Sequence, residues 1–534
     1  MKYGFVIDNR KCIGCHACTT ACKSEHQVPV GVNRTWVKQV EKGTFPNSRR
    51  LFSVMRCNHC TDAPCVEICP VEALFIRDDG IVDFDNRRCI ACKSCMQACP
   101  YDALYIDPET HTAAKCNYCA HRIDVGLEPA CVNVCPEHAI ISGDMENPET
   151  EISQLLARQS IKVRKPEKGT VPNLFYIDAD DASLVPSVAA KTEGTLWSSQ
   201  SRGVGHFAKE AEKMAFSNGD VVTELLMKDP SYKNGEGKTS VEALMEQKKS
   251  VYDTPSKGIL WGWEVSAYVW TKAISAGAFL FPFIAWFFGS SQFTAKTSML
   301  SIGIGLVFLA LTGILLIKDL DQPKRFAYVL LRPQWKSWLV RGGYAITAFG
   351  GLLTLYGLAT WLQISAGIGV LRWITFVAGM LVAVYTAFLF AQAKGRDFWQ
   401  SPTLALHMII HSFMAGAAAY GVVQIITPIE GNLTGFASTV MIVGIIINLI
   451  TMASELLTTH PTADAATTVE MIVKGRYKNL FWVGVVLVGN LIPLIWLFFD
   501  PSSIAIGISG ILVLIGIYCT EHIWVEAPQT ISLS

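Results

Sequence analysis

Apolar residues are distributed very unevenly along this chain. In residues 1–250 short apolar stretches alternate with polar ones, whereas residues 251–534 contain eight apolar spans, each of about 20 residues, the length that crosses a membrane as a helix. The spans are 264–288, 298–317, 338–362, 369–392, 404–427, 436–457, 480–499 and 503–520. Tryptophans near the span ends, such as Trp261 and Trp482, are typical of a membrane interface. The pattern predicts an all-α bundle of eight transmembrane helices after a polar first half.

Composition supports the same division. The first 250 residues contain 63 charged residues and the remaining 284 contain 27. Since about a quarter of a soluble domain is charged, only the first half has the composition of one. The 45 basic and 45 acidic residues give a net charge of zero, which does not favour nucleic-acid binding. We predict a domain at 1–180, a connector at 181–255 with an amphipathic helix over 206–227, and a membrane domain at 256–534.

Sixteen of the 17 cysteines lie between Cys12 and Cys135 and form four runs. The first and third runs have the C-x2-C-x2-C-x3-C spacing of bacterial ferredoxins, in which the fourth cysteine ligates the second cluster of a pair. The spacing predicts an α+β double-ferredoxin domain with four [4Fe–4S] clusters. The predicted ligand sets are Cys12, Cys15, Cys18 and Cys135; Cys22, Cys116, Cys119 and Cys131; Cys57, Cys60, Cys65 and Cys99; Cys69, Cys89, Cys92 and Cys95.

Two other uses of cysteine fit this spacing poorly. Structural zinc sites use C-x2-C pairs that are separated by a dozen or more residues, and three cysteines within seven residues do not match them. A disulfide framework needs an oxidising compartment and a small fold. We therefore interpret the sixteen thiols as cluster ligands, which makes this half a path for electrons rather than a substrate site.

Residues flanking the cysteines carry a resemblance to a known family. The segments that carry it are Cys57-Asn-His-Cys60-Thr-Asp-Ala-Pro-Cys65, Asp85-Asn-Arg-Arg-Cys89 and Ala114-Lys-Cys116-Asn-Tyr-Cys119. Over residues 1 to about 180 the chain resembles the four-cluster electron-transfer subunits of complex iron–sulfur molybdoenzymes. Some members of that family lack a cysteine at the position of Cys92 and hold a three-iron cluster there. Because this chain has Cys92, the resemblance implies four [4Fe–4S] centres.

The second half resembles the NrfD/polysulfide-reductase membrane subunits over about residues 255–534. The segments that carry the resemblance are Asp319–Phe326, Ser337-Trp338, Tyr385–Leu389 and Lys394–Trp399. It implies a site for a quinone, menaquinone or ubiquinone, near the membrane face that bears the cluster domain, and usually no haem. The family's usual Asp-Leu-Gly-Arg-Pro is Asp319-Leu-Asp-Gln-Pro323 here, so this loop departs from the family pattern at its third and fourth positions.

Ionisable residues within membrane spans are candidates for function, because an unpaired charge is costly there. Glu264, Tyr268 and Lys272 share one face of the first span. Lys272 fits either a structural ion pair or a quinone or proton role, and Glu264 fits an interfacial position as well. For Tyr385 the resemblance favours a hydrogen bond to a quinone, with a packing role as the alternative. Asp319, at the end of the second span, fits the same site or a salt bridge to the basic loop.

A second group of candidates lies in the fifth and sixth spans. His407 and His411 are four residues apart and therefore share a helix face. Structural hydrogen bonding, a quinone or proton role, and haem or metal binding are all open to this pair. Glu455 is an intramembrane acid for which a proton path and a structural hydrogen bond are the two interpretations.

Eight spans place both ends of the membrane domain on one side. The loops on that side contain eleven basic residues, and the opposite loops contain only Lys296 and Arg372. By the positive-inside rule we expect an inner-membrane protein with its cluster domain in the cytoplasm. The first residues show no export signal of their own, although export bound to a signal-bearing partner is compatible with the sequence.

The predicted function is an electron-transfer and membrane-anchor subunit that links a quinone pool to a catalytic subunit. The sequence shows neither a pterin-binding domain nor a nucleotide-binding loop, so substrate chemistry is expected on another chain. That chain is expected to be a molybdenum- or tungsten-pterin enzyme of sulfur, arsenic or nitrogen compounds. The alternatives are a quinone-linked subunit of a hydrogenase or cytochrome-fed complex, and an ion-translocating membrane subunit.

Overall fold

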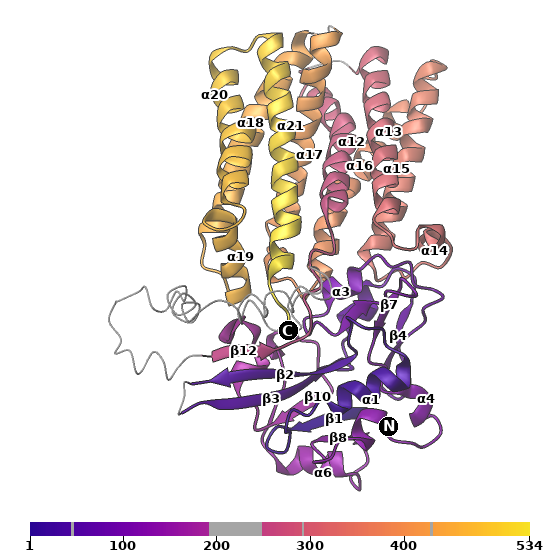
Figure 1. The fold of residues 1–534 in the computed structure, drawn as a ribbon. Coiled ribbons are helices and arrows are strands. Elements are labelled where there is room, and N and C mark those ends of the chain that lie inside the picture. Colours follow the sequence, from indigo (N-terminus) through magenta and orange to yellow (C-terminus); the bar gives the residue numbers. More distant parts are fainter. Residues whose placement is uncertain (44–46, 192–247, 291–292, 428–430) are drawn as a thin grey trace.

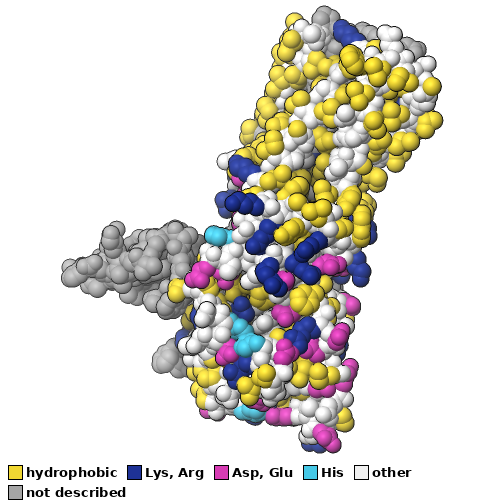
Figure 2. Space-filling model, turned by 90° about the vertical axis from the view of Figure 1, so that its right-hand side faces the viewer, with side chains coloured by type: hydrophobic (Ala, Val, Ile, Leu, Met, Phe, Trp, Pro, Cys, Tyr) yellow, Lys and Arg dark blue, Asp and Glu magenta, His cyan; other side chains and the backbone are white. Residues whose placement is uncertain are grey.

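The computed structural model describes residues 1–43, 47–191, 248–290, 293–427 and 431–534. Figure 1 shows two parts stacked end to end, one of strands and short helices and one of long helices that run side by side. We refer to the described part of residues 1–252 as the cluster half and to that of 253–534 as the membrane half. On the face that Figure 2 shows, hydrophobic side chains cover most of the membrane half, whereas charged side chains gather on the cluster half and around the joint.

Two four-stranded sheets and two hairpins build the cluster half. In the first sheet, of order β8-β1-β10-β9, β1 is parallel to β10 and antiparallel to β8. The second sheet has the order β11-β12-β2-β3, and the hairpins are β4-β5 and β6-β7. The strands are β1 Tyr3–Asp8, β2 Thr35–Lys42, β3 Arg49–Arg56, β4 Leu74–Ile76, β5 Val82–Phe84, β6 Leu104–Ile106, β7 Ala113–Lys115, β8 Ile140–Asp144, β9 Ile161–Lys162, β10 Leu174–Ile177, β11 Ala190–Lys191 and β12 Lys248–Tyr252.

Short helices carry several of the cysteines. Helix α2 precedes hairpin β4-β5 and helix α3 precedes hairpin β6-β7, so the two middle cysteine runs are built as a structural repeat. The α-helices of this half are α1 Ala17–His26, α2 Pro64–Ile68, α3 Ser94–Ala98, α4 Ala120–Ile123, α5 Ala130–Asn133, α6 Glu151–Arg158 and α7 Asp181–Leu184. The predicted α+β cluster domain is thereby confirmed.

The predicted connector, 181–255, is described only at its two ends. Strand β11 pairs with β12, and β12 pairs with β2, so both ends belong to a sheet of the cluster half. The amphipathic helix predicted over 206–227 lies outside the described residues. The two described ends of the connector therefore both lie in the cluster half, ahead of the first membrane helix.

Eight long apolar helices form the membrane half, as predicted. They are α12 Trp263–Phe287, α13 Ala295–Lys318, α15 Trp338–Trp361, α16 Ile368–Gln392, α17 Leu404–Ile426, α18 Gly431–Leu457, the π-helix η6 Leu480–Leu491 continued by α20 Ile492–Phe499, and α21 Ser503–Glu526. The short helices α14 Tyr328–Leu331 and α19 Ala463–Val473 lie close to the joint (Figure 1). Helix α21 runs several residues beyond the predicted span 503–520.

Helix α12 is the centre of the bundle, because it contacts α13, α16, α17 and α21. Its crossing with α17 depends on two glycines. A Cβ on Gly277 would overlap the Ser412 carbonyl oxygen, and a Cβ on Gly416 would overlap the Gly277 carbonyl oxygen. Small residues allow helices to approach this closely in membranes, where dispersion contacts drive association. Small residues therefore set the crossing that positions α12.

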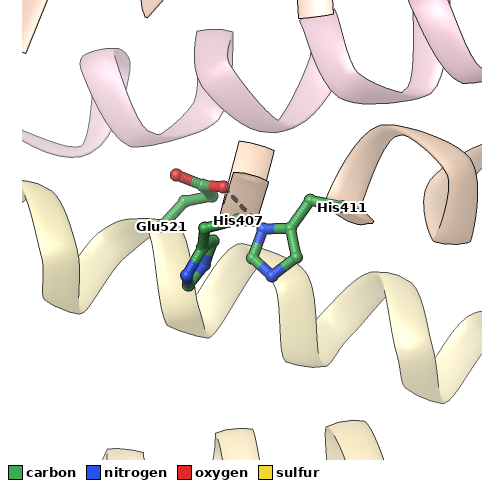
Figure 3. A group of neighbouring side chains, drawn as sticks. All are labelled: His407, His411 and Glu521. Carbon is green, nitrogen blue, oxygen red and sulfur yellow. Dashed lines mark hydrogen bonds and ion pairs between the residues drawn. The ribbon is translucent and has the colours of Figure 1, made fainter. Parts of the chain in front are cut away.

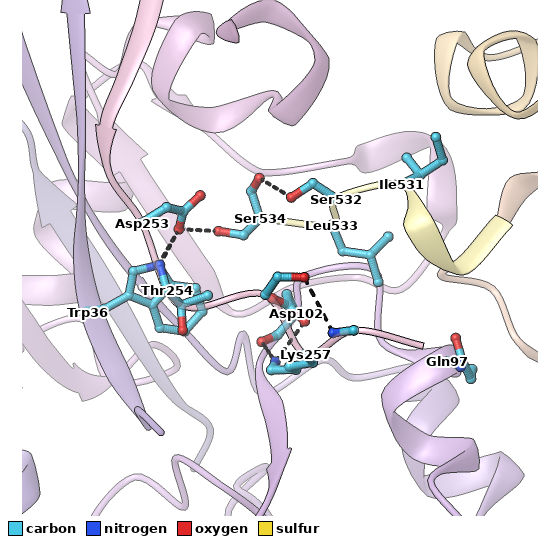
Figure 4. A network of polar contacts seen from close by, with 12 residues as sticks. Trp36, Gln97, Asp102, Asp253, Thr254, Lys257, Ile531, Ser532, Leu533 and Ser534 are labelled. Carbon is cyan, nitrogen blue, oxygen red and sulfur yellow. Dashed lines mark hydrogen bonds and ion pairs between the residues drawn. The ribbon is translucent and has the colours of Figure 1, made fainter. Parts of the chain in front are cut away.

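The C-terminal segment fills the joint between the two halves. Asp253 accepts hydrogen bonds from Trp36 Nε1 at 2.9 Å and from Ser534 Oγ at 2.6 Å (Figure 4). Lys257 Nζ pairs with Asp102 Oδ1 at 2.7 Å in the same region. Strands of the cluster half, the start of the membrane half and the end of the chain thus share one polar network.

Candidate functional site

The structure brings the sixteen cysteines together in the four predicted sets. Cys69, Cys89, Cys92 and Cys95 line one cavity, and a second is lined by the set that contains Cys12 and Cys135. In the other two sets, Cys99 lies within electrostatic range of Cys57, Cys60 and Cys65, and Cys22 within that of Cys116, Cys119 and Cys131. All 17 cysteines are free thiols, so none is used in a disulfide.

Local backbone geometry fits these sets to iron–sulfur clusters. His16, His59, Lys93 and Tyr118 lie within or beside the runs and have positive φ angles, which turn the backbone sharply between neighbouring cysteines. Backbone amides donate to the ligand sulfurs at 3.3 Å, from Ala91 to Cys89 and from Ala73 to Cys69 in one set, and from Ala139 to Cys135 in another. Such hydrogen bonds to cluster sulfurs tune the reduction potential.

A buried cation lies between two of the sets. Arg56 is fully buried, and its Nη1 donates to Cys131 Sγ at 3.1 Å. Its guanidinium also lies over the Phe5 ring, 4.4 Å from the ring centroid. A buried charge is costly unless it is paired, and ligand thiolates supply the negative charge that Arg56 requires. The side chain therefore fits a site that carries clusters.

The four sets follow one another in a row. Neighbouring sets interact electrostatically through Cys95 and Cys65, then through Cys57 and Cys116, and finally through Cys131 and Cys18. The set of Cys69, Cys89, Cys92 and Cys95 lies at the membrane half. The set of Cys12, Cys15, Cys18 and Cys135 is at the other end, where Cys15 is exposed. The row thus leads from the joint to the surface.

A cavity of about 220 Å³ lies between the membrane half and the cysteine set that contains Cys92. Cys92 is part of its wall, and Trp261 Nε1 donates to the Cys92 carbonyl oxygen at 3.1 Å. Most of the lining is apolar and comes from Val265, Leu316, Leu320, Phe326, Val329, Leu339, Ile346 and Leu389. An apolar cavity with a few polar groups is typical of a binding site for a small hydrophobic molecule.

Three of the predicted quinone residues meet in this cavity. Tyr268, Asp319 and Tyr385 all line it, although they come from α12, the end of α13 and α16. Lys272 lies directly behind Tyr385, with its Nζ 4.9 Å from the centroid of the tyrosine ring. Glu264 lies at the start of α12 and pairs with Lys318 at 3.7 Å. Of the two interpretations of Glu264, the interfacial one matches this position.

Asp319 supplies a carboxyl group to the cavity wall. Burial raises the pKa of its carboxyl to about 7; Lys93 opposes this shift, and Glu264 and Asp321 add to it. Lys93 follows Cys92 in the chain, and its Nζ bonds the Asp319 carbonyl oxygen at 3.3 Å and Asp321 Oδ1 at 3.2 Å. The loop that departs from the family pattern therefore contacts Lys93, the residue between Cys92 and Cys95, through Asp319 and Asp321.

His407, His411 and Glu455 do not lie in the cavity. They form a second buried group with Glu521, a residue of α21 that the sequence analysis did not single out. His411 Nδ1 lies 2.7 Å from Glu521 Oε1, and His407 packs against His411 with ring centroids 4.2 Å apart (Figure 3). The predicted eighth span ends at residue 520 and therefore leaves Glu521 outside the membrane. The apolar helical pattern continues beyond residue 520, and a span that followed it would include Glu521.

Two of the eleven basic residues on this face join the halves. Arg325 Nη1 donates to the carbonyl oxygens of Asn86 and Cys89, at 2.8 and 2.9 Å. Arg396 is buried and donates to Gln97 Oε1 at 2.8 Å and to the carbonyls of Pro528 and Ile531 in the C-terminal segment. Burial lowers the pKa of Arg396 to about 10.

Comparison with known proteins identifies both halves. Two families described as 4Fe-4S dicluster domains match residues 11–74 and 49–145, and the polysulphide reductase NrfD family matches residues 253–532. A tetrathionate reductase subunit of Salmonella typhimurium is 46% identical over 200 residues, which are 37% of this chain and 80% of that protein. One of the polysulfide reductase chains of Wolinella succinogenes is 41% identical over 181 residues, 33% of this chain and 94% of that protein.

A third relative is the arsenate respiratory reductase iron-sulfur subunit of a Shewanella species. It is 33% identical over 225 residues, 33% of this chain and 96% of that protein. The family matches confirm the predicted iron–sulfur clusters and, together with the eight apolar helices, an integral membrane protein. Since the match to its second half covers more than half of its length, the chain belongs to the polysulphide reductase NrfD family and carries 4Fe-4S dicluster domains in its first half.

Proposed function

We propose that this chain carries electrons between a quinone pool in the membrane and a catalytic subunit, through four [4Fe–4S] clusters held by the four cysteine sets. The observation that carries the proposal is the cavity at the joint, whose wall includes both Cys92 and membrane-half residues. Iron–sulfur clusters, when bound, transfer electrons singly, at potentials that their surroundings tune. A quinone in this cavity would lie against the set of Cys69, Cys89, Cys92 and Cys95.

Residues of the cavity suit quinone chemistry. The hydroxyls of Tyr268 and Tyr385 can donate to quinone oxygens, and the apolar lining accommodates the ring and part of the tail. A pKa of about 7 allows the Asp319 carboxyl to hold or release a proton near neutral pH. The quinone, menaquinone or ubiquinone, is the substrate of this site, whereas other substrate chemistry belongs to the catalytic subunit.

The far end of the row is the proposed docking site of that subunit. Cys15 is exposed there, and Ile13 beside it has 56% of its surface accessible. The relatives are named as subunits of tetrathionate, polysulfide and arsenate reductases. We propose that the partner is a molybdenum- or tungsten-pterin enzyme for a sulfur, arsenic or nitrogen compound. Metal analysis of the co-purified complex tests this, because nickel or haem in place of molybdenum or tungsten contradicts it.

For the membrane side, we propose that the cluster half faces the cytoplasm. Leaving out Arg325 and Arg396, which bind carbonyls at the joint, nine of the eleven basic residues still support this orientation against two on the opposite side. The exposed residues Lys478 and Asp500 lie on opposite sides of the membrane half. In intact cells, a membrane-impermeant maleimide should label an Asp500→Cys variant and spare Lys478→Cys; the reverse pattern contradicts the orientation.

Anaerobic mixing tests the electron-transfer function. The purified complex is reduced with dithionite and mixed with short-chain menaquinone or ubiquinone, and the cluster signals are followed by electron paramagnetic resonance. We expect rapid loss of the reduced signals. Tyr385→Phe should slow this about tenfold or more without changing the signals themselves, since it removes one cavity hydroxyl. Tyr356→Phe is the control, because Tyr356 is buried on α15 outside the cavity.

Failure to oxidise any cluster with either quinone would contradict the proposal. Loss of the reduced signals in Tyr385→Phe before any quinone is added would instead assign Tyr385 a structural role.

A further inference from the structure

A line of buried ionisable side chains leaves the cavity and crosses four helices. We propose that Lys272, Glu521, His411, His407 and Glu455 form a proton relay between the quinone in the cavity and the surface at Ser401 and Thr403. This inference rests on the proposed quinone function. It adds a path for the protons that quinone chemistry requires.

The relay begins behind the cavity wall. Lys272 Nζ donates to Thr386 Oγ1 at 2.7 Å and to the Ala383 carbonyl oxygen at 3.1 Å, while its charge faces the Tyr385 ring. Lys272 is 1% exposed. It has no carboxylate within ion-pair distance among the described residues, so the structural ion pair that the sequence left open is not formed. Glu521 is the acid that interacts with Lys272 electrostatically.

The second part of the relay joins α21 to α17. Glu521 is 3% exposed, and its Oε1 lies 2.7 Å from His411 Nδ1. Figure 3 shows this contact; on its other side Glu521 interacts electrostatically with the Lys272 ammonium, so the carboxylate lies between an ammonium and an imidazole. A carboxylate between two such groups can receive a proton from one side and release one to the other.

The third part runs along α17 to α18. The rings of His411 and His407 are in edge contact, and His407 Nδ1 lies 3.5 Å from Glu455 Oε2. Imidazole carries a donor and an acceptor on different nitrogens, so it can take up and release a proton on opposite sides. Apart from this 3.5 Å contact with Glu455, neither nitrogen of His407 has a hydrogen-bond partner among the described residues. A purely structural network would satisfy these buried atoms.

The exit lies at the start of α17. Thr403 Oγ1 donates to Glu455 Oε1 at 2.6 Å, and Thr403 and Ser401 are joined by a hydroxyl contact of 2.6 Å. Both hydroxyl residues are partly exposed at the face that carries the cluster half. Trp524 Nε1 holds the other Glu455 oxygen at 3.0 Å. The relay therefore opens on the same side of the membrane half as the cavity.

Among the residues that the structure describes, the polar groups packed around the relay are neutral. Tyr385 faces Lys272 from α16, Tyr268 of α12 lies within electrostatic range of Glu521, and Asn448 lies near His411 from α18. Asn448 Nδ2 in turn donates to Asn490 Oδ1 of η6 at 3.1 Å. With Lys272 and one histidine protonated, these two cations balance the carboxylates of Glu521 and Glu455.

The stoichiometry of the coupled step is simple. Reduction of one quinone to quinol consumes two electrons, which leave two reduced clusters one at a time, and two protons. The protons enter from Ser401 and Thr403 and reach the quinone oxygens through the relay and the cavity hydroxyls. Oxidation of quinol reverses every transfer and releases two protons on that same side.

Glu521→Gln in the intact complex is the principal test. The reduced complex is mixed with short-chain menaquinone, and cluster oxidation is followed over a range of pH in water and in heavy water. We expect the rate of cluster oxidation to fall about tenfold or more, with a larger solvent isotope effect and a changed pH profile. The cluster signals and the quinone affinity should stay normal. Glu521→Asp should recover part of the rate. His522→Gln is the matched control, because His522 is adjacent on α21 but pairs with Glu526 at 3.6 Å.

Infrared difference spectra between oxidised and reduced quinone give a readout that does not depend on rate. A carboxyl band should be present in the wild type and absent from Glu521→Gln and Glu455→Gln. If wild type fails to react with quinone, the proposed function is wrong. If wild type reacts and Glu521→Gln has an unchanged rate, pH profile and spectrum, the relay alone is wrong. A stoichiometric metal that is lost from His411→Gln would also overturn it, since these residues would then be ligands.

Discussion

The cluster half and the membrane half assemble their sites in different ways. In the cluster half, the ligands of one set come mostly from a run of a few residues, and short helices and tight turns hold them in place. In the membrane half, Tyr268, Asp319 and Tyr385 lie on different elements, and only helix packing brings them into one cavity. Cysteine spacing in the sequence is enough to predict a ligand set of the cluster half. The cavity of the membrane half can be recognised only from the packed helix bundle.

The largest expected effect comes from breaking a ligand set in the cluster half. Cys65→Ser removes one ligand from the set that lies second from the membrane, so we expect iron content to fall by about a quarter and quinone to oxidise only the cluster next to the membrane. Metal binding also supplies folding energy, so the unfolding temperature should fall. Iron analysis, paramagnetic resonance and thermal unfolding measure this. Cys519→Ser, which changes the lone cysteine of α21, should leave all three unchanged.

The corresponding change in the membrane half removes space rather than a ligand. Gly416→Val places a side chain where the backbone of α12 already lies, and overpacking of this kind costs about 3 kcal/mol or more. We expect thermal unfolding of the membrane half in detergent at a clearly lower temperature, with quinone affinity lost and iron content kept. A Cβ added at Gly435 has nothing within 4 Å, so an equal effect of Gly435→Val would contradict the packing argument.

These differences explain what could be predicted from the sequence. Cysteine spacing predicted the four sets because each lies largely within one run, and apolar length predicted eight spans. The sequence also selected Tyr268, Asp319 and Tyr385, but their meeting with Cys92 depends on how the two halves dock. It missed Glu521 because the end of a helix is set by contacts near residues 521–526, not by hydropathy. Arg396 was counted as a membrane-side charge, although it is buried in the joint.

Arg396 tests whether the halves depend on one another. Arg396→Ala leaves Gln97 Oε1 and the carbonyls of Pro528 and Ile531 without this donor, which should destabilise the joint by about 2–3 kcal/mol. We expect the rate of cluster oxidation by quinone to fall severalfold while iron content stays normal. Limited proteolysis should release the C-terminal segment faster. Arg476→Ala removes an exposed charge on the same face and should change none of these, so equal sensitivity there would argue against the joint.

The smallest expected effect concerns Asp319, a residue of the membrane half whose backbone carbonyl accepts a hydrogen bond from Lys93 of the cluster half. Burial raises the pKa of its carboxyl from 3.8 to about 7 in the folded protein, so the unfolded chain loses this proton at lower pH. Its contribution to stability therefore falls as pH rises from about 4 to about 7 and is constant above that range. Relative to Asp319→Asn, the wild-type unfolding temperature should be lower at pH 8 than at pH 5, by a few degrees. Asp500→Asn, at an exposed position on the opposite side, should show no such difference. If Asp319→Asn parallels the wild type at both pH values, Asp319 is charged throughout, and the cavity lacks the proton-holding group that the joint was expected to provide.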